Sequence, residues 1–278
     1  MLTSCFSRHF CLDFIIHQWS VPTQLLLWCL PNDNSKAVIT ANEQIHSAHR
    51  ECRLQLPETA IVFFMSKGTD YLIAHYDTEE MAEPFPRFLN RCPIWKVKDS
   101  EICFLDGGRG APQAVDTVET LAALGVKNII AVGMCGAYND NVCVGEIVAP
   151  HKAFVEEGTS LHYYESIEAA YPNKDLLDTA TSLFNIKNHP IVSTDAVYRQ
   201  TFEKEKLWRE KGAVGVDMET SAVFSVAQYL GLNAVALLMV SDIHPMQPDA
   251  PKWEWHMTRD MKYHLAEQGI ALAKKLIK

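Results

Sequence analysis

From Pro57 onward, short apolar segments alternate with segments of helical periodicity, and this alternation constrains the fold more than any other feature of the chain. Helices are expected where apolar residues recur every three to four positions, and strands where short apolar runs are bounded by turn residues. The predicted strands span 60–65, 94–97, 102–105, 129–132, 146–149, 191–193 and 234–240. The predicted helices span 112–124, 174–184, 202–211, 218–230 and 258–277. Such alternation predicts a single α/β domain with a parallel or mixed central sheet.

Composition excludes several classes of protein. The 278 residues carry a formal net charge of −9, which argues against nucleic acid or an anionic membrane as a partner. No apolar run approaches the ~18 residues that a membrane span needs. The apolar stretch 10–19 is interrupted by Asp13 and His17, so we do not expect a secretory signal. The eight cysteines show no C-x-x-C pair, which favours reduced thiols and a cytoplasmic protein.

The residues that follow the predicted strands are the first candidates for a binding site. In open α/β sheets, ligands bind in the crevice beyond the carboxyl ends of the strands. The glycine-rich turn 107–110 joins a strand to a helix, and its N–H groups suit an anion. A tight turn would need glycine in any case. The spacing does not fit a dinucleotide fingerprint, because Gln113 stands where a glycine is required.

Two carboxylates stand at comparable positions later in the chain. Glu219 opens an apolar helix, and Asp242 follows seven apolar residues. Glu219 is either a simple complement to the helix N-terminus or a ligand for hydroxyl groups. Asp242 is either a turn or cap residue or, in a closed apolar pocket that raises its pKa, a general acid.

Other candidates are weaker. Cys135 is better interpreted as a buried thiol than as a nucleophile, because no base lies near it in the sequence. His46, His49 and Cys52 share a helical face but suggest no fourth ligand, so we expect no metal site. Trp253 and Trp255 are either a lid or a packing cluster.

Taken together and in order, these segments resemble the nucleoside phosphorylase-I family. The resemblance is carried by 108–112, 121–136, 144–148, 157–162, 193–195, 216–222 and 240–242. It extends over 57–278, which it implies to be the catalytic domain, with 1–56 an N-terminal segment that packs on the core. It further implies a partly barrel-like mixed sheet flanked by helices, and a homo-oligomer, either a dimer or a hexamer.

The resemblance also implies roles for residues. Glu219 and Met218 would bind ribose, and Asp242 would protonate a purine base, so Glu219 and Asp242 are the expected catalytic residues. The phosphate site would comprise Arg109, Gly108, Gly133 and Met134. The base would contact Cys135, Gly136, Asp195, Val197 and Asp242. No cofactor is expected beyond inorganic phosphate as co-substrate.

Several positions depart from the family pattern. Phosphorolytic relatives carry a Gly-Asp-Pro-x-Arg turn where this chain has Ser66-Lys67-Gly68, and an arginine where it has Ala131. Arg109, with Lys67 or Ser66, would then supply the phosphate ligands. The water-activating glutamate of the hydrolytic relatives is missing as well, and their base-stacking aromatic is replaced by Val197.

The resulting prediction is a nucleoside phosphorylase that acts on a purine nucleoside. Asp242 favours a purine, whereas the segment 158–162 is more similar to uridine phosphorylases. The alternatives are a nucleosidase that uses water, a nucleoside-binding protein without turnover and, more remotely, a nicotinamide-dependent enzyme.

Overall fold

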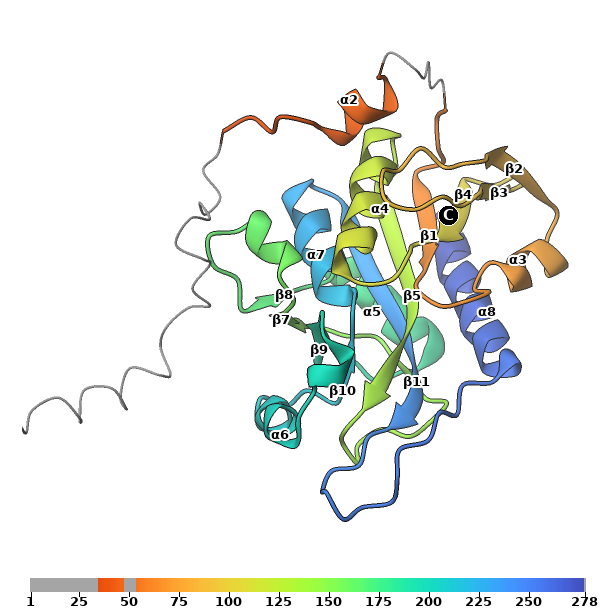
Figure 1. Cartoon of the computed structure of the whole chain (residues 1–278). Helices are drawn as coiled ribbons and strands as arrows, with labels where there is room; N and C mark the ends of the chain where they lie inside the picture. Colours follow the sequence, from red (N-terminus) through yellow and green to blue (C-terminus); the bar gives the residue numbers. More distant parts are fainter. Residues whose placement is uncertain (1–34, 48–53, 278) are drawn as a thin grey trace, which may run out of the picture.

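The computed structural model describes residues 35–47 and 54–277 (Figure 1). Its strands are β1 (Thr59–Phe63), β2 (Thr78–Ala82), β3 (Ile94–Val97), β4 (Ile102–Asp106), β5 (Asn128–Ala137), β6 (Ile147–Val148), β7 (Ala153–Glu156), β8 (Ala169–Ala170), β9 (Ile191–Thr194), β10 (Gly215–Asp217) and β11 (Asn233–Ile243). The α-helices are α2 (Ala41–Ile45), α3 (Asp70–His75), α4 (Ala111–Ala123), α5 (Lys174–Phe184), α6 (Phe202–Glu210), α7 (Thr220–Tyr229) and α8 (Arg259–Leu276). Two short 3₁₀ turns, η1 (Thr159–His162) and η2 (Val197–Arg199), complete the set.

Strand β5 organises the sheet. Along its whole length it pairs with β11 in parallel. On its other side, the first half pairs with β1 in parallel and the end pairs with β10 in the antiparallel direction. The sheet therefore branches at β5, with the order β2-β3-β4-β1-β5-β10-β9-β7-β8 and β11 and β6 off this path. The mixed sheet flanked by helices that the sequence predicts is confirmed. Among the described residues, no pairing joins β2 to β8, so the sheet curves around β5 without closing.

Alternating side chains of the central strands supply two hydrophobic layers. Ala60, Val62 and Ala131 face α4 and α7. Their sequence neighbours Ile61 and Val132 face α5 and α8. The two sets of helices thus cover opposite faces of β1, β5 and β11 (Figure 1), which leaves the carboxyl ends of these strands open beside α6.

The predicted elements are recovered with two corrections that bear on the site. Residues 133–136 were expected to form a turn after a strand, but they continue β5 to Ala137. The prediction failed because two glycines suggested a break, whereas pairing with β10 and β11 keeps the backbone extended. Asp242 likewise lies inside β11, at a bulge between Val240 and Asp242, and does not follow the strand.

The remaining differences concern short or exposed elements. The strands β2, β7, β8 and β10 and the helix α3 were not predicted. Of the expected N-terminal segment, α2 contributes the fully buried Ile45 to the core layer that contains α4. The stretch 10–19 lies outside the described residues. Among the residues described, no helix combines the length and the apolar character needed to cross a membrane.

Gly269 sets how closely α8 approaches the sheet. A Cβ at this position would lie 3.0 Å from Cγ2 of Val132 and 3.6 Å from Cγ2 of Ile61. We expect Gly269→Leu to overpack this contact and to destabilise the protein by about 1–3 kcal/mol. In thermal unfolding, each kcal/mol lowers Tm by roughly 2–4 °C in a domain of this size. The control is Lys275→Leu on the exposed side of α8. Equal Tm values for the two variants would show that Gly269 does not limit the approach.

Candidate active site

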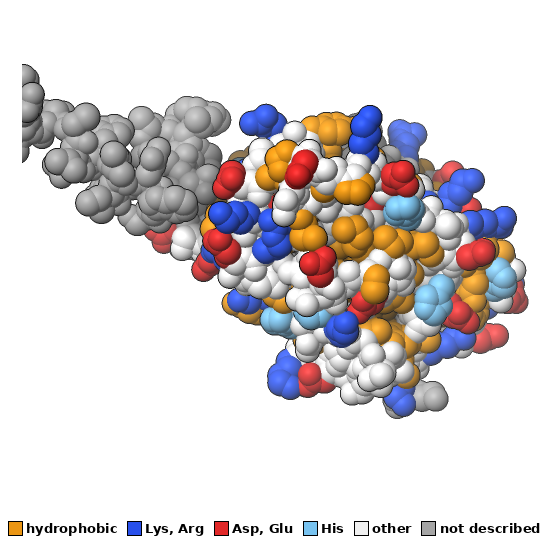
Figure 2. Space-filling model, turned by 90° about the horizontal axis from the view of Figure 1, so that it is seen from below, with side chains coloured by type: hydrophobic (Ala, Val, Ile, Leu, Met, Phe, Trp, Pro, Cys, Tyr) orange, Lys and Arg blue, Asp and Glu red, His pale blue; other side chains and the backbone are white. Residues whose placement is uncertain are grey.

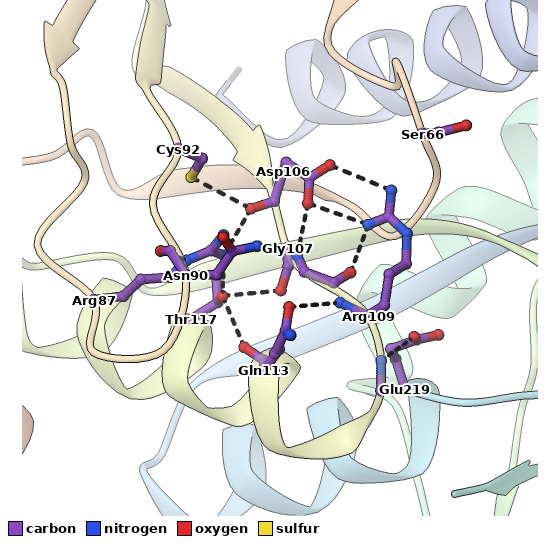
Figure 3. Close-up of polar contacts among 12 residues, drawn as sticks. Ser66, Arg87, Asn90, Cys92, Asp106, Gly107, Arg109, Gln113, Thr117 and Glu219 are labelled. Atoms are coloured by element: carbon purple, nitrogen blue, oxygen red, sulfur yellow. Dashed lines mark hydrogen bonds and ion pairs between the residues drawn. The ribbon is translucent and has the colours of Figure 1, made fainter. Parts of the chain in front are cut away.

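Glu219 is anchored at the point where three elements meet. It follows β10 and occupies the N-cap position of α7, with a side chain that is almost fully buried. Its Oε1 accepts a hydrogen bond of 2.6 Å from the backbone N–H of Gly110. Gly110 is in turn the N-cap of α4 and has a φ of 82°, a backbone conformation that favours glycine. The N-terminus of α4 therefore holds the Glu219 carboxylate in place (Figure 3).

Asp217 lies two residues before Glu219 and shares its environment. Its carboxylate accepts from the hydroxyls of Ser193 and Thr220 and from the Thr220 N–H. Burial raises the pKa of Asp217 despite these hydrogen bonds. Burial, and then the charge of Asp217, also raises the pKa of Glu219. Burial thus disfavours ionisation of both acids, and the charge of Asp217 further disfavours ionisation of Glu219.

Asp242 has a different electrostatic setting. One carboxylate oxygen accepts from the Ser241 hydroxyl, and the other accepts from Nε1 of Trp253 at 2.6 Å. Nε2 of His244 lies 3.3 Å from the same Oδ2. Burial acts to raise the pKa of Asp242, but the hydrogen bonds from His244, Ser241 and Trp253 outweigh it and lower the pKa. The expectation that an apolar pocket raises this pKa was wrong, because the pocket supplies three donors to the carboxylate.

Gly136 makes room for this arrangement. A Cβ at residue 136 would lie 2.4 Å from Nε2 of His244 and 3.1 Å from Oδ2 of Asp242. The glycine is therefore required by the close approach of His244 and Asp242 to β5.

Both Glu219 and Asp242 open into one pocket of about 670 Å³, a size common for small-molecule sites. The pocket lies at the carboxyl ends of β5, β10 and β11. On the face of the molecule seen from below, hydrophobic side chains gather in the middle with charged ones around them (Figure 2). The aromatic residues among those lining the pocket are Phe64, Tyr198, Phe202, Trp253 and Trp255.

Arg109 lines the same pocket but is engaged with its own turn. Its guanidinium contacts both oxygens of Asp106, at 3.1 and 3.3 Å, and donates to the carbonyl of Gly108 at 2.6 Å (Figure 3). The Gly108 N–H donates to Asp106 as well, at 2.7 Å. The glycine turn was expected to offer free N–H groups to an anion, but those of Gly108 and Gly110 already donate to carboxylates of the chain.

Further cations lie beside this turn. Nζ of Lys262 on α8 donates to the Ser66 hydroxyl at 2.8 Å and to the Ser66 carbonyl at 3.2 Å. Burial and the charges of Arg109 and Lys67 lower the pKa of Lys262. In Figure 3, Arg109 lies between Ser66 and Glu219. Segments after β1 and β4 and the start of α8 thus bring positive charge to one side of the site.

The structure gathers some of the predicted site residues and separates others. Those that line the pocket are Arg109, Met134, Gly136, Val197, Met218, Glu219 and Asp242. Gly108, Gly133, Cys135 and Asp195 are not among them. Cys135 is buried, and burial raises the pKa of its thiol, which fits the packing interpretation. Asp195 accepts from the Gly158 N–H at 2.8 Å and so ties two loops together.

Titratable residues of the pocket that sequence reasoning did not assign to the site include Asp217 at the end of β10, Glu205 on α6 and His244 just after β11. His244 follows Asp242 by two positions, and this spacing places both side chains on one face of an extended chain. That pattern was a usable signal. Glu205 offered none, because it lies in a helix that is otherwise amphipathic and charged.

The metal prediction rests partly on residues outside those described. His49 and Cys52 fall in the undescribed range 48–53. Within 35–47 and 54–277, no cluster of three or more histidine, cysteine, aspartate or glutamate side chains is arranged to hold a metal ion.

Comparison with known proteins identifies the family of the chain. Residues 58–278 match the family model of the phosphorylase superfamily. A guanosine phosphorylase from Halorubrum lacusprofundi is 36% identical over 51% of this chain and 60% of its own length. A DeoD-type purine nucleoside phosphorylase from Clostridium beijerinckii is 32% identical over 52% and 64%. The chain thus spans about three fifths of the length of these two relatives.

Solved structures share the fold. A uridine phosphorylase from Vibrio fischeri superposes with a TM-score of 0.64 and 22% identity, over 80% of this chain and 93% of that one. The same enzyme in complex with 6-hydroxy-1-naphthoic acid gives a TM-score of 0.63.

The raised pKa of Glu219 predicts a pH-dependent stability. A carboxyl group with a higher pKa in the folded than in the unfolded state binds more protons when folded, so the free energy of unfolding falls as pH rises above the ordinary glutamate value of 4.5. We expect Glu219→Gln to melt at about the same temperature as the wild type near pH 4.5 and at a higher temperature in alkaline buffer. Thermal unfolding over a pH series measures this difference. Glu210→Gln, at an exposed position, is the control. A pH-independent difference between Glu219→Gln and the wild type would contradict the assignment.

Proposed function

The chain belongs to the phosphorylase superfamily, and on this premise we propose that it cleaves the N-glycosidic bond of a purine nucleoside with inorganic phosphate, giving the free base and ribose 1-phosphate. No other cofactor is required for this reaction.

The observation that carries the proposal is that Glu219 at the start of α7 and Asp242 on β11 face one pocket. As the glycosidic bond breaks, positive charge grows on the sugar and negative charge on the base. Side chains placed where these charges develop stabilise the transition state more than the bound substrate, and so accelerate the reaction. Glu219, with Met218 beside it, binds the ribose hydroxyls, and its fixed position on the N-terminus of α4 needs no rearrangement during the reaction. Asp242 meets the base.

The preference for a purine rests on two supports. A carboxyl group at the base suits a ring nitrogen that takes up a proton on leaving, as N7 of a purine does. The curated relatives with 31–36% identity are named purine or guanosine phosphorylases. Val197, which is half exposed, together with the aromatic residues of the pocket, offers the base an apolar surface.

Phosphate binding is assigned to side chains. Arg109 lines the pocket, the charges of Lys67 and Lys262 lie near that of Arg109, and Lys262 donates to the Ser66 hydroxyl. Arg109 keeps 43% of its side chain exposed while it contacts Asp106. Its remaining N–H groups are therefore accessible to a phosphate oxygen.

Hydrolysis by water is the second candidate. The pairing of Arg109 with Asp106 favours it, because the guanidinium charge is partly neutralised before any phosphate binds. A nucleoside-binding protein without turnover is less well supported, since binding alone does not require the hydrogen-bonded acid at residue 242.

We also propose that the enzyme is a cytoplasmic homo-oligomer, either a dimer or a hexamer. The cysteines within the described residues, Cys92, Cys103, Cys135 and Cys143, are all free thiols, which supports a reducing compartment. Tyr198, at 95% exposed, extends from the pocket mouth into solvent, as do Trp253 and Trp255 at about half exposure. Aromatic side chains in such positions are common at interfaces between subunits.

The reaction is tested directly by base release. Purified protein is incubated with inosine, guanosine, adenosine, uridine or methylthioadenosine, with and without phosphate, and free base is followed by chromatography. We expect base from the purine nucleosides only when phosphate is present, and a loss of this activity in Asp242→Asn. Release without phosphate would establish hydrolysis, and release from uridine alone would overturn the purine assignment.

The phosphate ligands are tested by kinetics. We expect Arg109→Met and Lys262→Met each to raise KM for phosphate by about 10-fold or more, because one charge-assisted hydrogen bond contributes roughly 1.5–3 kcal/mol. KM for the nucleoside should stay close to the wild-type value. Lys275→Met, farther along the exposed side of α8, serves as the control. An unchanged phosphate KM in both site variants would refute this ligand set.

A further inference from the structure

Behind Asp242 lies a pair of residues to which the proposed reaction gives no role so far. Nδ1 of His244 is 2.7 Å from Oε1 of Glu205, and its Nε2 is 3.3 Å from Oδ2 of Asp242. The three side chains are largely buried, with exposed fractions of 18% for His244, 7% for Glu205 and 4% for Asp242. They form a continuous line from α6 across the end of β11 to the pocket.

This line favours a charged imidazole. Each ring nitrogen of His244 faces a carboxylate oxygen, and only the imidazolium carries a proton on both nitrogens. The third titratable group facing His244 is Tyr138, just after β5, whose ring centre is 6.3 Å away. The Tyr138 hydroxyl donates to the carbonyl of Gly215, and the imidazole nitrogens contact Glu205 and Asp242. Burial lowers the pKa of His244, but the hydrogen bonds to Asp242 and Glu205 outweigh it and raise the pKa to about 9.

The charge distribution leaves Asp242 without a proton of its own. Its lowered pKa keeps it a carboxylate at neutral pH, whereas the leaving base needs a proton as the glycosidic bond breaks. His244 is more acidic than the other two donors to that carboxylate, the Ser241 hydroxyl and the Trp253 indole, and its Nε2 lies 3.3 Å from Oδ2. The pocket also includes His244 and Glu205 in its lining, so the line of residues extends to the place where the base would bind.

We propose that His244 supplies the proton that Asp242 passes to the leaving base, and that Glu205 is a positioning residue that holds His244 in place for this transfer. The inference rests on the proposed cleavage of a purine nucleoside. The bond between the sugar carbon and the base nitrogen breaks, and its electron pair stays on the base. Nε2 of His244 first gives its proton to the Asp242 carboxylate, and the carboxyl group so formed then gives that proton to N7 of the base as the bond breaks. Asp242 ends as the carboxylate it was, and His244 ends neutral, with its Nδ1 proton held by Glu205, until water reprotonates Nε2.

Comparing two nucleosides distinguishes a role of His244 in supplying the proton from a purely structural role. Inosine requires a proton at N7 of its leaving base, whereas 7-methylguanosine already carries positive charge on its base and leaves as a neutral molecule without one. We expect His244→Gln to lower kcat on inosine by about 10²–10⁴-fold, the usual contribution of a general acid, and to leave kcat on 7-methylguanosine roughly unchanged. Both reactions are run with phosphate on full-length protein, and thermal unfolding monitors the fold of each variant.

The pH profile gives an independent measurement. The wild-type kcat/KM for inosine should fall as pH rises through about 9, where His244 loses its proton. Glu205→Gln removes one of the two carboxylates that keep the imidazole charged, so this alkaline limb should move to lower pH. This second variant retains the histidine and tests the inference even if His244→Gln unfolds.

The outcomes are distinguishable. Equal losses of kcat on the two nucleosides, with an alkaline limb that Glu205→Gln does not move, would mean that His244 is only structural and would overturn the inference alone. Full activity of His244→Gln on inosine would do the same. A wild-type protein that releases no base from either nucleoside would overturn the proposed function and this inference together.

Discussion

The site depends on the burial of one carboxylate, that of Glu219. Burying a polar group without a hydrogen-bond partner costs roughly 2–7 kcal/mol, so the position of the Glu219 carboxyl group is set by the group that satisfies it. Here the Gly110 N–H at the start of α4 does so at 2.6 Å. That single contact requires the turn after β4, the end of β10 and the start of α7 to meet at one point. The acceptor at the N-terminus of α4 is thus a carboxyl oxygen of the protein itself, and Glu219 directs its remaining acceptor capacity into the pocket.

The two acids of the site are set apart by their surroundings. Glu219 has Asp217 as a neighbour, and its pKa is raised. Asp242 has hydrogen-bond donors on both oxygens, and its pKa is lowered. When the surroundings of two carboxyl groups shift their pKa values in opposite directions, the two groups commonly have different chemical roles, such as acid and base. In the proposed reaction, this difference leaves Asp242 ionised, and the proton for the base would come from His244 beside it.

Much of the fold and half of the site follow from the sequence, for identifiable reasons. The apolar runs of β1, β5 and β11 predict a buried sheet because every residue of such a strand faces one of two helical layers. Glu219 and Asp242 were identifiable because charged residues next to buried elements are unusual. The extension of β5 through Gly133 and Gly136 was not predictable, because it is the close approach of His244, distant in sequence, that requires the glycine at 136. The ion pair of Arg109 with Asp106 was not predictable either, because the sequence shows the positive charge of Arg109 but not its partner.

The N–H groups of the glycine turn 107–110 that donate to the chain's own carboxyl groups are not free to bind a nucleophile. Because the N–H groups of Gly108 and Gly110 donate to Asp106 and Glu219, a phosphate in this site would be held by side chains and not by backbone. Side-chain cations from separate segments repel one another when no anion lies between them, and this repulsion contributes to the lowered pKa of Lys262. A bound phosphate would relieve the repulsion and would fix Lys262 relative to Arg109. In the proposed reaction, the balance between phosphate and water as nucleophile would therefore depend on how strongly Asp106 retains Arg109, and not on Glu219 and Asp242.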